Sequence, residues 1–231
     1  MSAPGASHDP WNPSYVPRPT YDLVLPFYEP LVAWLLSDAH ARLGLLADSG
    51  LAAGHQALEV ACGSAELALL LADRVPTADV YAVDPNPRRL ARAIGRSCHA
   101  GRYFRVYRAP VERLPFPNES IDRVYFSFGL CRLPRELKVA ALREARRVLF
   151  REGSLHVLDF APPVSRWDLV MAKALLRWRN VRALVNGELP ALLAEAGFVR
   201  AEETRGVSAP VGRLARWIAH PHRARPTEDW E

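Results

Sequence analysis

Cysteine is scarce in this sequence of 231 residues. Its three cysteines, Cys62, Cys98 and Cys131, lie far apart along the chain. An odd number at such wide spacing does not form a disulfide framework and is typical of a reducing compartment. The sequence also contains no pair of Cys or His residues at zinc-site spacing, so we expect no metal ion.

Long hydrophobic runs are absent as well. A run such as residues 65–72 is too short to cross a bilayer and contains Glu66, so we expect no transmembrane segment. The N-terminus lacks a basic patch followed by an apolar run, and a secretory signal is therefore not expected. These absences predict a cytoplasmic protein, while peripheral contact with a membrane stays open.

Lysine contributes only Lys138 and Lys173 to the 30 basic residues, and the formal net charge is +5. Many of the arginines fall in helical patterns with acids nearby, which is typical of a solvated surface. A nucleic-acid site would need clustered basic residues with interleaved aromatics, and the sequence shows no such cluster. We therefore expect a small-molecule ligand and no nucleic-acid partner. The sequence does not indicate an oligomeric state.

Strand-like and helix-like segments alternate along the central part of the chain. Predicted strands cover residues 57–61, 80–83, 103–107, 121–126 and 154–160, and predicted helices cover 30–50, 67–74, 87–97 and 135–149. Two more helical segments, 167–178 and 188–196, precede two strands at 198–204 and 214–219 whose short spacing implies an antiparallel pair. Regular alternation of this kind predicts an α/β fold with a doubly wound, mostly parallel sheet.

The length and the hydrophobic content of 49% fit one domain with a sizeable core. Residues 1–20 are rich in Pro, Ser and Asn and predict a flexible N-terminal arm. Residues 21–220 are then expected to form the single domain, followed by a polar tail at residues 221–231.

The most informative stretch joins the first two predicted strands. Glu59 comes at the end of the first strand, small residues around Gly63 form the loop before the next helix, and Asp84 ends the second strand. A loop of small residues allows a ligand to approach the backbone, and an acid at the neighbouring strand end can accept hydrogen bonds from ribose. The alternative, that Asp84 caps a helix, is less favoured because Asn86 and Pro87 already supply that start signal.

Five motifs carry a resemblance to a known family. The chain has A-L-E-V-A-C-G-S-A-E at 57–66, V-E-R-L-P-F-P-N-E-S-I-D at 111–122, S-F-G-L-C-R at 127–132, A-L-R-E-A-R-R-V-L-F-R-E-G at 141–153 and L-D-F-A-P-P at 158–163. In this order they resemble motifs of class I S-adenosylmethionine-dependent methyltransferases, over roughly residues 20–220. The resemblance is greatest to the C-methyltransferases of ubiquinone and menaquinone biosynthesis.

The resemblance implies a Rossmann-like methyltransferase fold of seven strands that closes with a C-terminal antiparallel hairpin. It further implies S-adenosylmethionine as cofactor and methyl transfer to a small, apolar metabolite, with a quinone precursor as the first candidate. A lipid or natural-product acceptor is an alternative. So is a non-catalytic binding protein built on the same fold.

The resemblance also implies a set of cofactor-binding residues. Asp84 would bind the ribose, Val111 and Glu112 would flank the adenine, and Ser127 would line the space between cofactor and acceptor. The full expected set is Glu59, Ala61, Gly63, Asp84, Pro85, Val111, Glu112 and Ser127.

Three departures from the family motifs qualify this expectation. Ala65 stands where the family has a second loop glycine, Pro110 where a side chain often reaches the adenine, and Cys131-Arg132 where the family has Arg-Asn. If position 65 needs a positive φ, alanine costs about 1–2 kcal/mol there. Ala65 and Pro110 motivate the non-catalytic alternative.

No catalytic acid or base is assigned. Asp159 could serve as a base for a phenolic acceptor, but the favoured interpretation is that it caps the loop after the fifth strand. The acceptor itself is expected beneath the N-terminal arm and the helical segment Val164–Asn186.

Overall fold

The structure is a computed structural model that describes residues 39–177 and 179–222. The chain divides into two compact units, Met1–Ser37 and Asp38–Glu231, and all described residues belong to the second. The predicted N-terminal arm, and all but the first two residues of the predicted tail, lie outside the described residues.

One sheet of seven strands organises the second unit, in the order β3-β2-β1-β4-β5-β7-β6. Its strands are β1 (Gln56–Val60), β2 (Asp79–Val83), β3 (Arg105–Tyr107), β4 (Ile121–Ser127), β5 (Leu149–Phe160), β6 (Arg200–Ala209) and β7 (Gly212–His220). The first five run parallel to one another, whereas β7 is antiparallel to both β5 and β6. The predicted parallel sheet with a closing antiparallel hairpin is confirmed.

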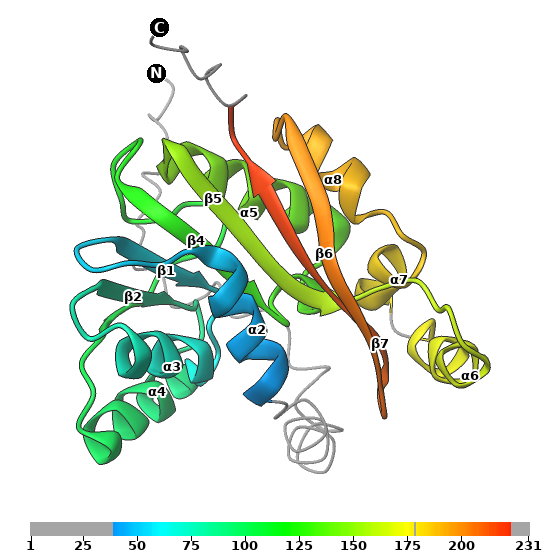
Figure 1. The fold of residues 1–231 in the computed structure, drawn as a ribbon, viewed down its shortest axis with the longest axis horizontal. Coiled ribbons are helices and arrows are strands. Elements are labelled where there is room, and N and C mark those ends of the chain that lie inside the picture. The colour runs from blue at the N-terminus through cyan, green and yellow to red at the C-terminus, as the bar shows by residue number, and fades with distance from the viewer. Residues whose placement is uncertain (1–38, 178, 223–231) are drawn as a thin grey trace, which may run out of the picture. The chain divides into compact units, whose positions relative to one another are not determined.

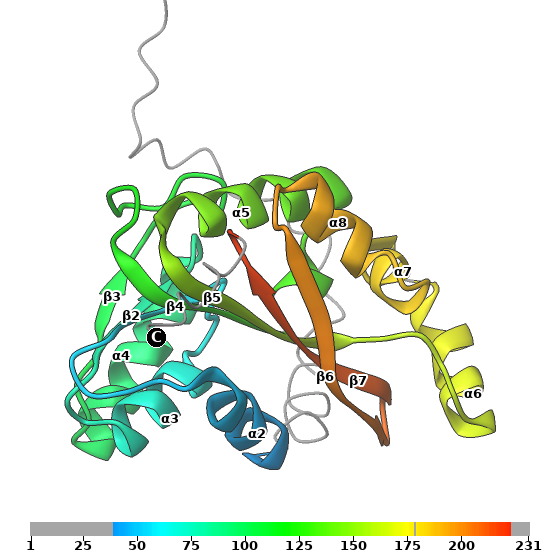
Figure 2. The ribbon, with the colours of Figure 1, turned by 45° about the horizontal axis from the view of Figure 1, so that its top comes forward.

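Helices cover both faces of this sheet. One face carries α2 (Ala39–Ser49), α3 (Glu66–Arg74) and α4 (Pro87–Ala100); the other carries α5 (Arg135–Val148) and α8 (Leu189–Glu195). Figure 2 shows the two groups on opposite sides of the strands. Beyond the carboxyl end of β5 follow α6 (Arg166–Leu175) and α7 (Arg179–Val185), which lie beside the β6–β7 hairpin in Figure 1. The prediction of a doubly wound arrangement is therefore also confirmed.

The hydrophobic core lies along the central strands. In β1 every residue after Gln56 is buried, and the last four residues of β4 are buried as well. Strands covered by helices on both faces read as continuous apolar runs, and this is the pattern that identified β1 and β4 in the sequence. A buried central pair of strands gives the loops at its carboxyl end a rigid base.

The element boundaries differ from the prediction in a few places. β5 begins at Leu149, directly after α5, and not at Ser154; its first residues pair with β4 across an irregularity between Ile121 and Arg123. The seven-residue helix α7 and the short 3₁₀ helix η2 (Leu130–Arg132) were not predicted. The three residues of η2 are too few for a helical periodicity to be read from the sequence.

Candidate cofactor site

The site lies where the strand order reverses. β1 stands between β2 on one side and β4 on the other, so the connections leaving β1 and β4 run in opposite directions across the sheet. In open α/β sheets, ligands bind at the carboxyl ends of the strands at such a point. The loops after β1, β2 and β4 therefore define the candidate site.

The loop after β1 has an unusual backbone. Ala61, Gly63 and Ala65 all adopt positive φ, at 54°, 58° and 55°. Such a conformation costs an alanine about 1–2 kcal/mol, so Ala61 and Ala65 store strain at this loop, as expected for position 65. The methyl group of Ala65 is nevertheless fully buried, and it does not extend from the loop into open space.

Asp84 ties the loop after β1 to the end of β2. Its Oδ2 accepts a hydrogen bond from the backbone N–H of Gly63 at 2.9 Å, and its Oδ1 accepts one from the N–H of Asn86 at 2.8 Å. The carboxylate is 1% exposed. Because each carboxylate oxygen has a further lone pair, Asp84 can still accept from ribose hydroxyls while it holds the loop.

Glu59 lies beneath the same loop. Its Oε2 accepts a hydrogen bond from the N–H of Ala68 in α3 at 2.8 Å. Burial raises the pKa of Glu59 to about 8, against the opposing effects of that hydrogen bond and of Arg42 and Arg132. At neutral pH this carboxyl is therefore largely protonated.

The residues after β4 pack directly onto the end of β1. A Cβ added to Gly129 would lie 3.2 Å from both the Cβ of Ala61 and the carbonyl oxygen of Val60. A side chain at this position would be crowded by both atoms, so the glycine of the S-F-G motif suits the close approach of the two loops. The preceding residue, Phe128, adopts φ 52°, and the centre of its ring lies 6.2 Å from the centre of the Phe160 ring.

Arg42 of α2 contacts the end of β4 from the face of the sheet that also carries α3 and α4. Its Nε donates to the Oγ of Ser127 at 3.3 Å, and its guanidinium lies 5.8 Å from the ring centre of Phe128. It also forms an ion pair with Glu66 at 3.0 Å. Ser127 thus lies at the expected position, with Arg42 fixed beside it.

A buried polar cluster supports the turn after β4. Asp159 of β5 accepts from the N–H groups of Cys131 and Phe160 at 3.0 and 2.9 Å, and burial raises its pKa. The ammonium of Lys138, which is 1% exposed, donates to the backbone carbonyls of Leu133 and of Asn180, the latter at 2.6 Å. These contacts favour the capping interpretation of Asp159 over that of a catalytic base.

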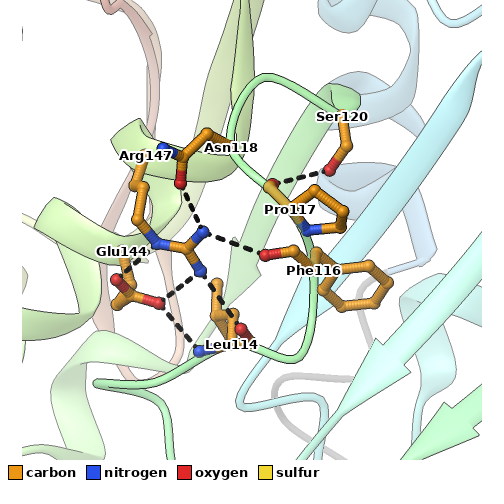
Figure 3. A network of polar contacts seen from close by, with 7 residues as sticks. All are labelled: Leu114, Phe116, Pro117, Asn118, Ser120, Glu144 and Arg147. Carbon is orange, nitrogen blue, oxygen red and sulfur yellow. Dashed lines mark hydrogen bonds and ion pairs between the residues drawn. The ribbon is translucent and has the colours of Figure 1, made fainter.

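Two residues of α5 hold the loop next to the predicted adenine-binding residues. Figure 3 shows the guanidinium of Arg147 bonded to the side chains of Glu144 and Asn118 and to the carbonyls of Leu114 and Phe116. Glu144 in turn accepts from the N–H of Leu114 at 2.9 Å. The A-L-R-E-x-x-R motif of α5 therefore anchors the loop that follows Val111 and Glu112.

The sequence-predicted residues lie at neighbouring strand ends and loops. Glu59 belongs to β1, Ala61 and Gly63 to the loop after it, Asp84 and Pro85 to the loop after β2, and Ser127 to the end of β4. Val111 is buried and Glu112 half-buried in the loop between β3 and β4. The sequence analysis did not select Arg42, Arg132, Lys138 or the pair Glu144 and Arg147; the E-x-x-R spacing in α5 was the one signal that could have indicated the last of these.

A cavity of about 500 Å³ opens between α2 and the strands β5, β7 and β6. Leu158 forms part of its wall and is the register partner of Ser127, so the cavity adjoins the end of β4. Apolar side chains line it together with charged ones at its rim. The lining residues are His40, Ala41, Gly44, Ala47, Asp48, Leu158, Arg205, Val207, Leu214 and Arg216.

Two absences hold for the residues that the structure describes. No helix within residues 39–177 and 179–222 is long and apolar enough to cross a membrane. Across these same ranges, no group of three or more His, Cys, Asp or Glu side chains could hold a metal ion.

Comparison with known proteins assigns this geometry to a class. Residues 57–153 match the methyltransferase domain family. The fold superposes on a crystal structure of a SAM dependent methyltransferase from Aquifex aeolicus with a TM-score of 0.58 at 20% identity, covering 77% of this chain and 88% of the other. The chain thus contains a methyltransferase domain and has the fold of a methyltransferase.

Two relatives place the chain within that class. It is 31% identical over 158 residues to the ubiquinone/menaquinone biosynthesis C-methyltransferase UbiE of Syntrophotalea carbinolica, and 33% identical over 163 residues to that of Cupriavidus necator. The alignments cover 67% and 69% of this chain and 65% of each relative. The chain therefore belongs to the class I S-adenosylmethionine-dependent methyltransferases and resembles those of quinone biosynthesis.

The residues of the site fit S-adenosylmethionine. Gly63 has no side chain that would separate a ligand from the backbone, and Asp84 retains lone pairs for ribose hydroxyls. The Asp84 carboxylate gives the same region acceptor character that suits a cationic cofactor.

Proposed function

We propose that the protein is an active methyltransferase that methylates the ring of a small quinone precursor. The observation that carries the proposal is the cavity of about 500 Å³ beside Ser127, at the end of β4. Its volume lies in the usual range for small-molecule sites. The names of the relatives favour a quinone precursor over a lipid head group or another natural product.

The cavity combines the two properties that a hydroxylated aromatic ring requires. Leu158, Val207 and Leu214 offer apolar area for the ring, whereas Asp48 and Arg216, an ion pair at 3.2 Å, and the exposed Arg205 offer polar contacts for oxygen substituents. The segment Val164–Asn186 contributes no residue to this cavity. Binding of the acceptor beneath that segment stays a prediction.

The chain's contribution to the reaction is alignment. S-adenosylmethionine supplies an electrophilic methyl group on a sulfonium, and the protein has to hold an acceptor carbon in line with it and keep water away. Asp84 and the Ala61–Ala65 loop would orient the cofactor, and Ser127, fixed by Arg42, would line the space in which cofactor and acceptor meet. Asp159 is engaged with two backbone N–H groups and is assigned no proton-transfer step.

A methyl-transfer assay with a panel of acceptors tests the proposal. The protein is incubated with cofactor carrying a labelled methyl group and with a demethylated naphthoquinol, a prenylated benzoquinol, a phospholipid amine or no acceptor. We expect labelled product with one of the two quinols, and mass spectrometry should place the methyl on the ring. Methylation of the amine alone would contradict the quinone assignment.

A matched pair of variants tests the cavity. Val207 lines it and is 46% exposed, whereas Val199 is 52% exposed and does not line it. Val207→Trp should fill the cavity and lower kcat/KM for the acceptor at least about tenfold, since a misplaced acceptor loses the in-line geometry. Val199→Trp should retain the wild-type value, and cofactor affinity should be unchanged in both variants. Equal acceptor kinetics in the two would show that the acceptor binds elsewhere.

A further inference from the structure

The guanidinium of Arg132 lies over the strained loop after β1. Its Nη2 donates a hydrogen bond to the carbonyl oxygen of Ala61. A Cβ built on Gly63 would come within 3.1 Å of Nη1 of the same side chain. The guanidinium therefore occupies the space that the missing side chain of Gly63 leaves over the loop.

The backbone of Arg132 is fixed from two directions. Its carbonyl accepts a hydrogen bond from the Nδ2 of Asn180 at 2.9 Å, and its N–H donates to the carbonyl of Gly129 at 3.3 Å. The buried Lys138 joins the two neighbouring segments by donating to the carbonyls of Leu133 and Asn180. The base of the side chain is thus rigid, while the residue as a whole is exposed.

The charged groups around the loop leave Arg132 without a carboxylate partner among the described residues. Glu66 pairs with Arg42 at 3.0 Å and with Arg96 at 2.7 Å. Asp84 is engaged with backbone N–H groups, and Glu59 is buried below the loop with its own N–H donor. Arg132 therefore donates to a neutral carbonyl, although a guanidinium binds a carboxylate more strongly and in a bidentate manner.

We propose that Arg132 binds the carboxylate of the methionine part of S-adenosylmethionine. A guanidinium has five N–H donors, so Arg132 can keep its hydrogen bond to Ala61 and present its remaining edge to the ligand. Because the guanidinium lies over Gly63, its remaining edge is available to a ligand that binds at this loop. The inference rests on the cofactor and is independent of the identity of the acceptor.

Calorimetric binding of two cofactors that differ only in this carboxylate tests the proposal. We compare S-adenosylmethionine with decarboxylated S-adenosylmethionine on the wild type and on Arg132→Gln. The variant should bind S-adenosylmethionine about 10- to 100-fold more weakly, because hydrogen bonds to a charged partner are lost. Its affinity for the decarboxylated compound should stay within about threefold of the wild type. S-adenosylhomocysteine, which keeps the carboxylate, should follow S-adenosylmethionine.

Arg135→Gln is the matched control. Arg135 lies three residues further along and pairs with Glu195 at 2.9 Å, so the variant removes the same charge without touching the loop. It should bind both cofactors as the wild type does, and thermal melting without ligand should show that both variants are folded. Equal weakening of both cofactors by Arg132→Gln would show that Arg132 only shapes the loop. Tighter binding of S-adenosylmethionine by that variant would show that the guanidinium blocks the site. Either result overturns the proposal.

Discussion

Two buried acids flank the strained loop after β1, and each of them accepts a hydrogen bond from a backbone N–H group of this region. Glu59 accepts from Ala68, Asp84 accepts from Gly63, and Ala61 and Ala65 hold the positive φ angles between them. Backbone strain persists only where the surrounding contacts determine the conformation. The acids therefore stabilise the loop that they are also expected to equip for cofactor binding.

Glu59→Gln should alter the pH dependence of stability. The pKa of Glu59 is raised from 4.5 to about 8, so between these values the folded protein keeps a proton that the unfolded chain has lost. The free energy of unfolding of the wild type should therefore fall as the pH rises through this window. The variant cannot titrate there, and its amide oxygen can still accept from Ala68. Relative to the wild type it should gain about 1 kcal/mol or more between pH 5 and pH 8.

Urea denaturation at several pH values measures this difference. The exposed Glu152→Gln is the control, since its carboxylate lies on the surface and no acceptor role is assigned to it. Parallel stability curves for wild type and Glu59→Gln across the window would contradict a raised pKa at this position.

Asp84→Ala should weaken cofactor binding more than it weakens folding. The loss of one acceptor for the N–H groups of Gly63 and Asn86 should cost about 1–3 kcal/mol of stability. The loss of the ribose contacts should lower the affinity for S-adenosylmethionine at least about tenfold. Calorimetry on the folded variant gives the affinity, and wild-type affinity would rule out the ribose role.

Asn86→Ala separates the two effects. Asn86 caps α4 by accepting from the N–H groups of Arg88 and Arg89. Its removal should cost about 1 kcal/mol of stability and leave cofactor affinity close to that of the wild type. A large loss of affinity in this variant would attribute the Asp84 effect to the helix start.

Among single residues, the site residues that could be predicted from the sequence are those that belong to a local sequence pattern. Asp84 and Gly63 stand at strand ends, and the structure joins them at 2.9 Å. Arg42 and Arg132 could not be chosen, because the sequence contains many arginines and no local pattern indicates which of them folds over the loop. Their positions depend on how α2 and η2 pack on the sheet.

Among the elements, α5 has two functions. Its buried face, which includes Val139, Leu142 and Val148, packs on the sheet. Glu144 and Arg147 instead hold the loop 114–118 (Figure 3). The periodicity of α5 predicted the helix, whereas the loop contacts could not be predicted because they join segments about 30 residues apart. The start of β5 was missed for a similar reason, since pairing with β4, and not local sequence, makes residues 149–153 extended.

Arg147→Ala should loosen this loop. The variant loses hydrogen bonds to Leu114, Phe116 and Asn118 together with the pair to Glu144, and we expect a loss of about 1–3 kcal/mol in the free energy of unfolding. Hydrogen exchange of the amides in 112–118 should accelerate. Arg143→Ala, on the same helix but exposed and in weak contact with the carbonyl of Glu195 at 3.5 Å, should leave both measurements unchanged. Unaltered exchange in Arg147→Ala would show that the loop is held by other contacts.

For the whole molecule, the order of strands and helices was the most predictable property. Alternating apolar runs indicated β1 to β5, and the short connection between the last two strands indicated the antiparallel hairpin of β6 and β7. The cavity between α2 and β5, β7 and β6 was not predicted, because its lining residues are scattered over four elements that lie far apart in the sequence. Each of these residues is ordinary in its local sequence, and only the tertiary fold brings them together.

Cofactor binding should stabilise the described domain as a unit, because the expected site residues Glu59, Asp84 and Ser127 lie at the carboxyl ends of three parallel strands, β1, β2 and β4. A ligand that binds only the folded state adds about 2.7 kcal/mol at a hundredfold excess over its Kd, which corresponds to a rise in Tm of about 5–10 °C for a domain of this size. Differential scanning calorimetry of the wild type with saturating S-adenosylmethionine should show this rise, and S-adenosylhomocysteine should produce a similar one. ATP, which shares adenine and ribose but lacks the methionine part, should give a much smaller shift, and Asp84→Ala should lose most of the shift at the same cofactor concentration. If millimolar cofactor left the Tm of the wild type unchanged, the strained loop would be closed to the ligand, and a non-catalytic role on the methyltransferase fold would replace the proposed activity.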